Sequence, residues 1–72
     1  MKTYYFTFML KQEGLAKHLQ PIVAKDESAA REKMFEMYGS EWAFCYDEKP
    51  EMYKDAPELT TVYAYEGSGY ND

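Results

Sequence analysis

The chain is organised around KDESAAREKMFEMYGSEWAFCY, residues 25–46, which predicts a short helix that ends at a glycine and leads directly into an aromatic strand. Asp26 can accept hydrogen bonds from the first free N–H groups of a helix that runs from about Glu27 to Tyr38. One apolar face of this helix is formed by Ala30, Met34, Met37 and Tyr38. Phe35 falls beside that face and is expected to be partly buried. Gly39 follows the last periodic residue, where a helix commonly needs a positive φ.

A strand is predicted directly after this glycine. Trp42, Phe44 and Tyr46 alternate with Ala43 and Cys45, at the two-residue period of a β-strand. Phe44 is expected on the buried side. The helix should therefore pack on a sheet by way of a tight turn.

The clearest strand lies at the start of the chain. Residues 2–11, KTYYFTFMLK, are dominated by aromatic and β-branched residues and lack glycine and proline, which predicts a long or central strand. Its inward side chains are expected to be Tyr4, Phe6, Phe8 and Leu10. Tyr5 and Met9 are expected outside.

Two more segments predict strands. Residues 19–24, LQPIVA, should pair antiparallel with the first strand and direct Ile22 and Ala24 toward the helix. Pro21 lacks an N–H group, so this strand is expected at an edge of the sheet or paired on one side only. Residues 59–66, LTTVYAYE, predict the last strand, and the pattern leaves open which of its faces is buried.

These elements predict one α+β domain over residues 1–66, of order β-β-α-β-β, with a mainly antiparallel sheet and the helix on one face. A chain of 72 residues allows a single domain with a modest core. The expected core consists of Phe6, Phe8, Ile22, Ala24, Ala30, Met34, Tyr38 and Phe44. Residues 67–72, GSGYND, are expected to form a flexible tail.

Composition limits the cellular setting. One cysteine cannot form an intramolecular disulfide, and no secretory signal pattern or long apolar run is present. A cytoplasmic protein without a membrane span is expected.

Charge is distributed unevenly along the chain. Residues 1–35 carry six basic and four acidic side chains, or +2, whereas residues 36–72 carry two basic and nine acidic ones, or −7. A negative field repels phosphate and favours cationic protein surfaces, so direct nucleic-acid binding is not expected. The acids could also serve only to keep a small protein soluble.

The sequence contains no catalytic constellation. Cys45 and His18 are the only thiol and the only imidazole, and Cys45 sits between two aromatic residues as a small buried hydrophobe would. The acids after Tyr46 lack the ligand spacing of a zinc or calcium site. We expect neither an enzyme nor a bound metal or cofactor.

A candidate partner-binding site lies in DEKPEMYKDAPE, residues 47–58, an acidic connector with one helical turn expected at residues 51–54. Four carboxylates there could form an interface rim around an aromatic anchor, Tyr53. These rim residues are Asp47, Glu48, Glu51 and Asp55. The same pattern is compatible with a solvated loop whose tyrosine folds back on the sheet.

The segment AAREKMFEMYGSEWAFCY, residues 29–46, resembles a group of short, largely uncharacterised proteins of bacteriophages and prophages of Gram-positive bacteria. That group pairs a helix of the type ARxKMFExYG with a WAFxY strand, and the likeness covers residues 22–48. It implies a phage accessory protein in the cytoplasm of a bacterial host. The motif consists of helix, turn and core residues, so it transfers no functional site.

Some small acidic phage proteins are anti-CRISPR or other anti-defence inhibitors, and the chain is similar to them in size and charge. The expected function is therefore a non-catalytic inhibitor, a monomer or weak homodimer, that occupies a basic nucleic-acid-binding surface of a host protein such as a CRISPR effector. The alternative is a self-associating scaffold or interaction module whose edge strand pairs with another chain.

Overall fold

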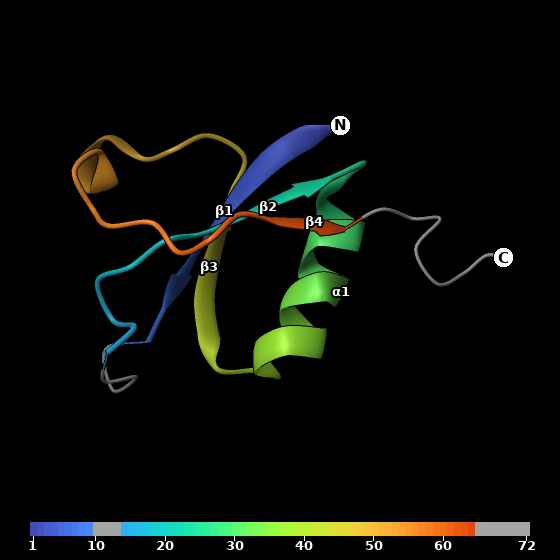
Figure 1. Ribbon diagram of the computed structural model, residues 1–72, viewed down its shortest axis with the longest axis horizontal. Coiled ribbons are helices and arrows are strands. Elements are labelled where there is room, and N and C mark those ends of the chain that lie inside the picture. Colours follow the sequence, from blue (N-terminus) through green and yellow to red (C-terminus); the bar gives the residue numbers. More distant parts are fainter. Residues whose placement is uncertain (10–13, 65–72) are drawn as a thin grey trace, which may run out of the picture.

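A four-stranded mixed sheet carries one helix on one of its faces (Figure 1). The computed structural model describes residues 1–9 and 14–64. In chain order its elements are β1 (Lys2–Phe8), β2 (Gln20–Ala24), α1 (Glu27–Tyr38), β3 (Trp42–Tyr46), the 3-10 turn η1 (Glu51–Tyr53) and β4 (Val62–Ala64). The strand order is β3-β1-β2-β4. Both neighbours of β1 pair with it antiparallel, and β4 pairs parallel with β2.

This architecture confirms the predicted α+β fold and its element order. β1 is an inner strand, as expected for the most apolar segment. The predicted inward position of Leu10, the end of the last strand and the tail at residues 67–72 lie outside the described residues. No helix in the described part of the chain is long and apolar enough to cross a membrane.

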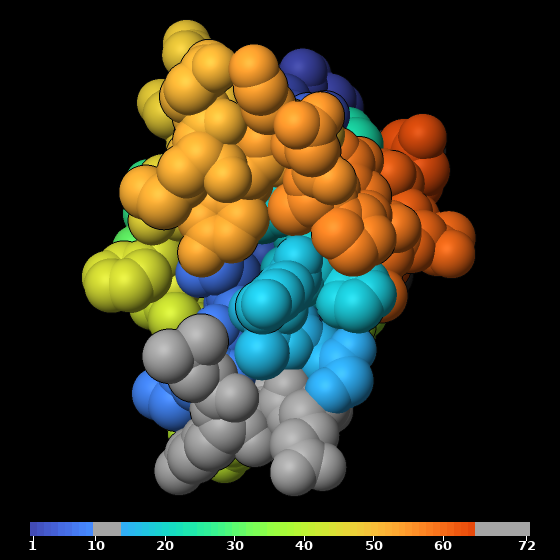
Figure 2. All heavy atoms as spheres, turned by 90° about the vertical axis from the view of Figure 1, so that its left-hand side faces the viewer, coloured from blue at the N-terminus to red at the C-terminus, as the bar shows by residue number. Residues whose placement is uncertain are grey.

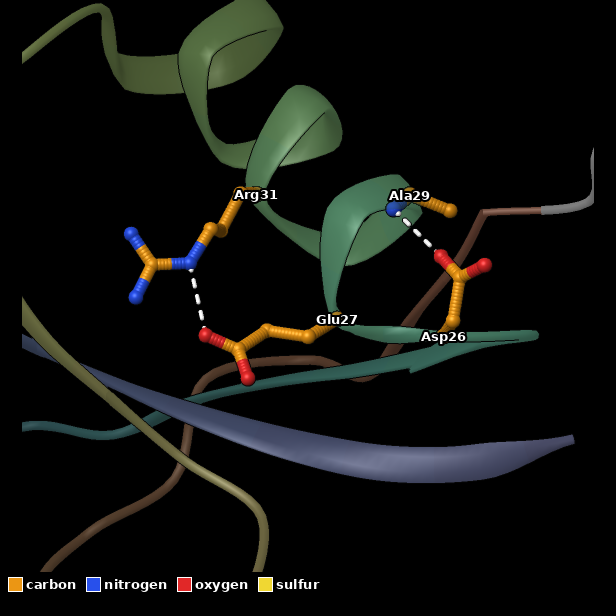
Figure 3. A network of polar contacts seen from close by, with 4 residues as sticks. All are labelled: Asp26, Glu27, Ala29 and Arg31. Atoms are coloured by element: carbon orange, nitrogen blue, oxygen red, sulfur yellow. Dashed lines mark hydrogen bonds and ion pairs between the residues drawn. The ribbon is translucent and has the colours of Figure 1, made fainter.

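The bounds of α1 follow from its two caps. The Asp26 Oδ1 atom accepts a hydrogen bond from the Ala29 N–H at 2.9 Å (Figure 3), which satisfies one of the free donors of the first turn. Glu27 pairs with the Arg31 guanidinium one turn later, at 2.8 Å. At the other end Gly39 has a φ of 64° and donates its N–H to the Phe35 carbonyl. The helix therefore begins and ends where the local signals predict.

The core lies between α1 and the sheet. Its buried side chains come from β1, β2, α1 and β4: Tyr4, Phe6, Phe8, Ile22, Ala24, Ala30, Met34 and Ala64. Tyr38 is half-buried and packs against them, with its ring edge-on to the Phe8 ring at 5.0 Å. Seven of the eight expected core residues thus lie in or against the core, and the alternation along β1 is confirmed.

Phe44 is the exception, and its predicted burial is wrong: the side chain is 63% exposed. The register between β1 and β3 shifts between Phe6 and Phe8, which pair with Cys45 and Trp42. Two residues of β3 consequently face Thr7 alone, and this bulge reverses the alternation. Trp42 and Cys45 therefore both pack toward the core, and Phe44 lies on the opposite face with Tyr46.

The predicted edge position of β2 is also wrong, because β2 lies between β1 and β4. In the register of Val23 with Tyr63, an N–H group at Pro21 would donate to the carbonyl of Thr60. The Gln20 side chain takes this role, since its Nε2 donates to the Thr60 oxygen at 2.8 Å. An inner strand can therefore contain this proline.

Phe35 is 56% exposed, so the expected partial burial is wrong as well. Its ring meets the Trp42 ring edge-on, with 5.7 Å between centroids. Trp42 belongs to β3, which is an edge strand of the sheet formed by residues 1–9 and 14–64. Phe35 therefore packs against the edge of the sheet and not against its centre.

Candidate protein-binding surface

The connector between β3 and β4 has a defined backbone. Tyr53 donates its N–H to the Pro50 carbonyl at 2.9 Å, Lys54 to Glu51 at 3.1 Å, and Ala56 to Tyr53 at 3.0 Å. These successive bonds form η1 and the turn after it, which confirms the expected helical turn. The connector therefore presents its side chains from a fixed scaffold.

The connector is fastened to the sheet at Leu19. The Leu19 N–H donates to the Pro57 carbonyl at 3.0 Å, and the Leu19 carbonyl accepts from the Leu59 N–H at 2.8 Å. Leu19 is fully buried, although it lies on the opposite strand face from the core residue Ile22. The connector therefore lies on the side of the molecule away from α1 (Figure 1). Figure 2 views this side, and residues 47–61, yellow to orange, form its upper part.

The structure divides the predicted site into two groups. Glu51, Tyr53 and Asp55 line a hollow of about 390 Å³, together with Met52 and other residues of the same turn. Asp47 and Glu48 are exposed at the end of β3 and do not line the hollow. The five predicted residues thus share the connector but do not surround a single point.

Tyr53 is half-buried and Met52 is 80% exposed. Met52 is consequently the most accessible apolar side chain of the turn, and it was not among the residues predicted for the site. No periodic pattern marks Met52, because a three-residue turn is too short to show one. Its unbranched thioether can fit surfaces of varied shape.

Charges around the hollow are balanced. Lys17 and Lys54 line it with the two acids, and the Lys54 Nζ atom lies 3.5 Å from a Glu51 carboxylate oxygen. Lys49 pairs with Glu58 at 2.6 Å. Such exposed pairs contribute little to stability, but they reduce the net charge that a partner meets.

Outside the hollow, the Asp47 Oδ2 atom lies 3.6 Å from the Lys2 Nζ atom. Both side chains of this ion pair are exposed, and the distance between them is long for an ion pair. Within residues 1–9 and 14–64, Glu48 and Asp55 make no ion pair. These two carboxylates and Asp47 are the acids of the connector most available to an external cation.

A row of aromatic side chains adjoins the connector on the sheet. Phe44 and Tyr46 project from the same face of β3, with 6.3 Å between ring centroids. Tyr46 is the cross-strand partner of Tyr5 in β1, and such partners share a face. We refer to Tyr5, Phe44 and Tyr46 as the aromatic strip.

The thiol and the imidazole do not form a catalytic pair. β1 separates β3, which carries Cys45, from the segment that leads into β2 and contains His18, a separation of about 10 Å across two strand spacings. The His18 Nδ1 atom is buried and has no hydrogen-bond partner in the described part of the chain. No group of three or more His, Cys, Asp or Glu side chains is arranged to hold a metal among residues 1–9 and 14–64.

Cys45 is a poor nucleophile in the folded protein. Burial raises the pKa of its thiol to about 11; the Glu27 carboxylate adds to this increase and the Arg31 guanidinium opposes it. The thiolate is the reactive form, so the native protein is expected to react with iodoacetamide near pH 8 about a hundredfold more slowly than the urea-unfolded chain. The native rate should rise with pH and reach half of its maximum near pH 11, where the thiol is half ionised.

Mass spectrometry of alkylated protein over a pH series measures this difference. The urea-unfolded chain is the internal reference, since it contains the same single thiol. Equal native and unfolded rates would show that the Cys45 environment does not suppress ionisation.

Comparisons with protein-family models, with curated proteins and with solved structures give no match.

Proposed function

We propose that the protein is a non-catalytic binding protein that uses the connector at residues 47–58 to engage a basic surface of another protein. The observation that carries this proposal is an ordered, exposed turn with five acidic and two basic side chains, held to β2 by backbone hydrogen bonds at Leu19. A fixed scaffold lowers the conformational entropy lost on binding.

The connector offers both components of a protein interface. Asp47, Glu48 and Asp55 supply negative charge that steers a cationic partner during encounter. Met52 supplies exposed apolar area at the turn between them. Carboxylates at the rim mainly affect association, and desolvated apolar contacts mainly affect dissociation.

For the partner, the proposal is a host defence protein with a basic nucleic-acid-binding groove, which an acidic inhibitor would occupy. The resemblance of residues 29–46 to phage and prophage proteins supports this choice, and so does the net charge of −5. A CRISPR effector has such a groove, since it holds its heteroduplex in a positively charged channel.

Self-association is the second candidate, because β3 is an edge strand with an exposed phenylalanine. Size-exclusion chromatography with light scattering distinguishes the two functions. A monomer at micromolar concentration favours the inhibitor, and a tight dimer favours a scaffold or interaction module.

The binding prediction concerns Asp47, Glu48 and Glu51. Replacing all three with lysine is expected to slow association with the partner about tenfold at low ionic strength and to weaken the salt dependence of binding. Tyr53→Ala is expected mainly to accelerate dissociation. The partner is first identified by affinity capture from host lysate, and the rate constants are then measured with purified components at two ionic strengths.

The matched control reverses three exposed acids elsewhere, Glu32, Glu36 and Glu41. Both triple variants change the net charge of −5 by the same six units, so a difference between them reports position and not total charge. Circular dichroism confirms that each variant is folded. Equal association rates for the two variants would exclude the connector as the contact site.

A further inference from the structure

Phe44 points away from the core and is 63% exposed. Cys45 pairs with the core residue Phe6, so its neighbour Phe44 lies on the outer face together with Tyr46. The bulge follows toward Trp42, and it returns Trp42 to the core side as the partner of Phe8. The bulge has its own support, because the Phe44 N–H donates to the Thr7 Oγ1 atom at 3.2 Å and Thr7 is only 2% exposed. Phe44 thus belongs to the bulge itself, and bulges are frequent at sheet edges and beside functional positions.

Phe44 does not stand alone on this face. The aromatic strip places two tyrosines beside it, and Asp47 and Glu48 follow directly in the chain. Side chains of β3, yellow-green, project at the left of Figure 2, next to the connector. An apolar aromatic group bordered by carboxylates is the pattern of an interface core with its polar rim.

We infer that the aromatic strip binds the apolar face of an amphipathic, basic α-helix of the protein partner, with Asp47 and Glu48 contacting lysine or arginine side chains beside that face. The inference rests on the proposed function, and it adds an apolar anchor and a partner conformation to it. Aromatic residues in such positions commonly dominate binding energy.

The irregular edge of β3 favours a helix as the occupant. The bulge interrupts the backbone ladder of β3, so an added strand would meet an irregular edge. A helix makes its contacts through side chains and does not need that ladder.

A second copy of the chain is less suitable. Each copy carries a net charge of −5, and two strips placed together would bring Asp47 and Glu48 of both copies close to one another. Like charges of this kind oppose association. A basic helix instead neutralises them.

The test uses a synthetic 18-residue helical peptide of leucine and lysine, with leucines on one face, and calorimetry at low and physiological salt. Phe44→Ala is expected to weaken binding about tenfold or more, as truncation of an apolar anchor does. Phe35→Ala is the matched control, because Phe35 is exposed to a similar extent, 56%, but lies on α1. It should change the dissociation constant less than about twofold.

Tyr46→Ala gives an independent variant of the strip and is also expected to weaken binding. Thermal unfolding of each variant verifies that the fold is retained. Absence of peptide binding, or equal effects of Phe44→Ala and Phe35→Ala, would overturn the inference. A dimer that Phe44→Ala dissociates would overturn it too, since the strip would then bind a second copy.

The same titration separates the inference from the proposed function. If lysine replacements at Asp47, Glu48 and Glu51 weaken peptide binding while Phe44→Ala does not, the strip is excluded and the acidic connector is retained. If Phe44→Ala weakens peptide binding while the charge reversals do not, the apolar contact of the strip is supported, but the contacts assigned to Asp47 and Glu48 and the electrostatic proposal both fail.

Discussion

Replacing Phe6 with alanine is expected to lower the free energy of unfolding by about 3 to 5 kcal/mol, the usual cost of truncating a buried phenylalanine. Phe6 is fully buried, and its ring meets the Trp42 ring edge-on at 5.1 Å. The substitution leaves a cavity and removes the contact that holds β3 against the core. A domain of this size has only about 5 to 15 kcal/mol of stability, so much of it would be lost.

Urea denaturation followed by Trp42 fluorescence and by circular dichroism measures the loss. Phe8→Ala should behave similarly, since Phe8 is also buried. Phe44→Ala is the matched control in β3, and its exposed ring predicts a change below about 1 kcal/mol. A smaller effect for Phe6→Ala than for Phe44→Ala would mean that the two sheet faces are exchanged.

The helix and its caps could be predicted because their signals are local. Asp26, Gly39 and the spacing of Ala30 and Met34 fix the two ends and the buried face within one short segment, and the structure retains all of these features. The alternation along β1 is equally local. Such features depend on propensities and periodicity that neighbouring residues express together.

The errors involve pairing between distant segments. Trp42 and Phe44 lie on opposite faces, and not on one face as predicted, because a bulge forms opposite Thr7. A period-two pattern cannot show where a bulge will form. Pro21 sits in an inner strand because the Gln20 side chain reaches the Thr60 carbonyl. That compensation joins residues forty positions apart and leaves no mark in the local pattern.

The candidate site could be predicted only in part, again because some of its contacts join segments that are distant in the sequence. Composition located the acidic connector and its helical turn, since charge and proline content are properties of a segment. It could not show that Lys17 approaches the hollow from another part of the chain. Nor could it show that Met52, and not Tyr53, is the more accessible side chain, because exposure depends on the tertiary contacts of the turn.

Gln20 is the other residue at which a single substitution should greatly lower the free energy of unfolding. Its Nε2 donates to the carbonyls of Thr60 and Pro21 at 2.8 and 2.9 Å, and its Oε1 accepts from the Tyr38 hydroxyl at 2.8 Å. Gln20 is 2% exposed, so water cannot replace these bonds. Gln20→Leu is expected to cost about 2 to 4 kcal/mol, because it leaves buried polar groups without partners.

A double-mutant cycle with Tyr38→Phe tests whether the three bonds act as a network. Tyr38→Phe removes only the donor to Gln20 and should cost about 1 kcal/mol. In the Gln20→Leu background the same change should cost much less, since the acceptor is already absent. Additive costs in urea denaturation would show that the tyrosine bond is independent of the glutamine.

Gln20→Glu removes only the two hydrogen bonds that the Gln20 amide group donates. The carboxylate keeps the acceptor for Tyr38 but places negative charge against the Thr60 and Pro21 carbonyls in a buried site. Burial raises the pKa of such a carboxyl group, so the folded variant holds its proton more strongly than the unfolded chain does. Its deficit relative to the natural protein should therefore be largest near pH 7 and shrink as the pH falls to about 4. A deficit that does not depend on pH would mean that the carboxylate reaches water in the folded variant. The absence of any deficit would mean that the link between β2 and β4 at Pro21 does not require the amide donor.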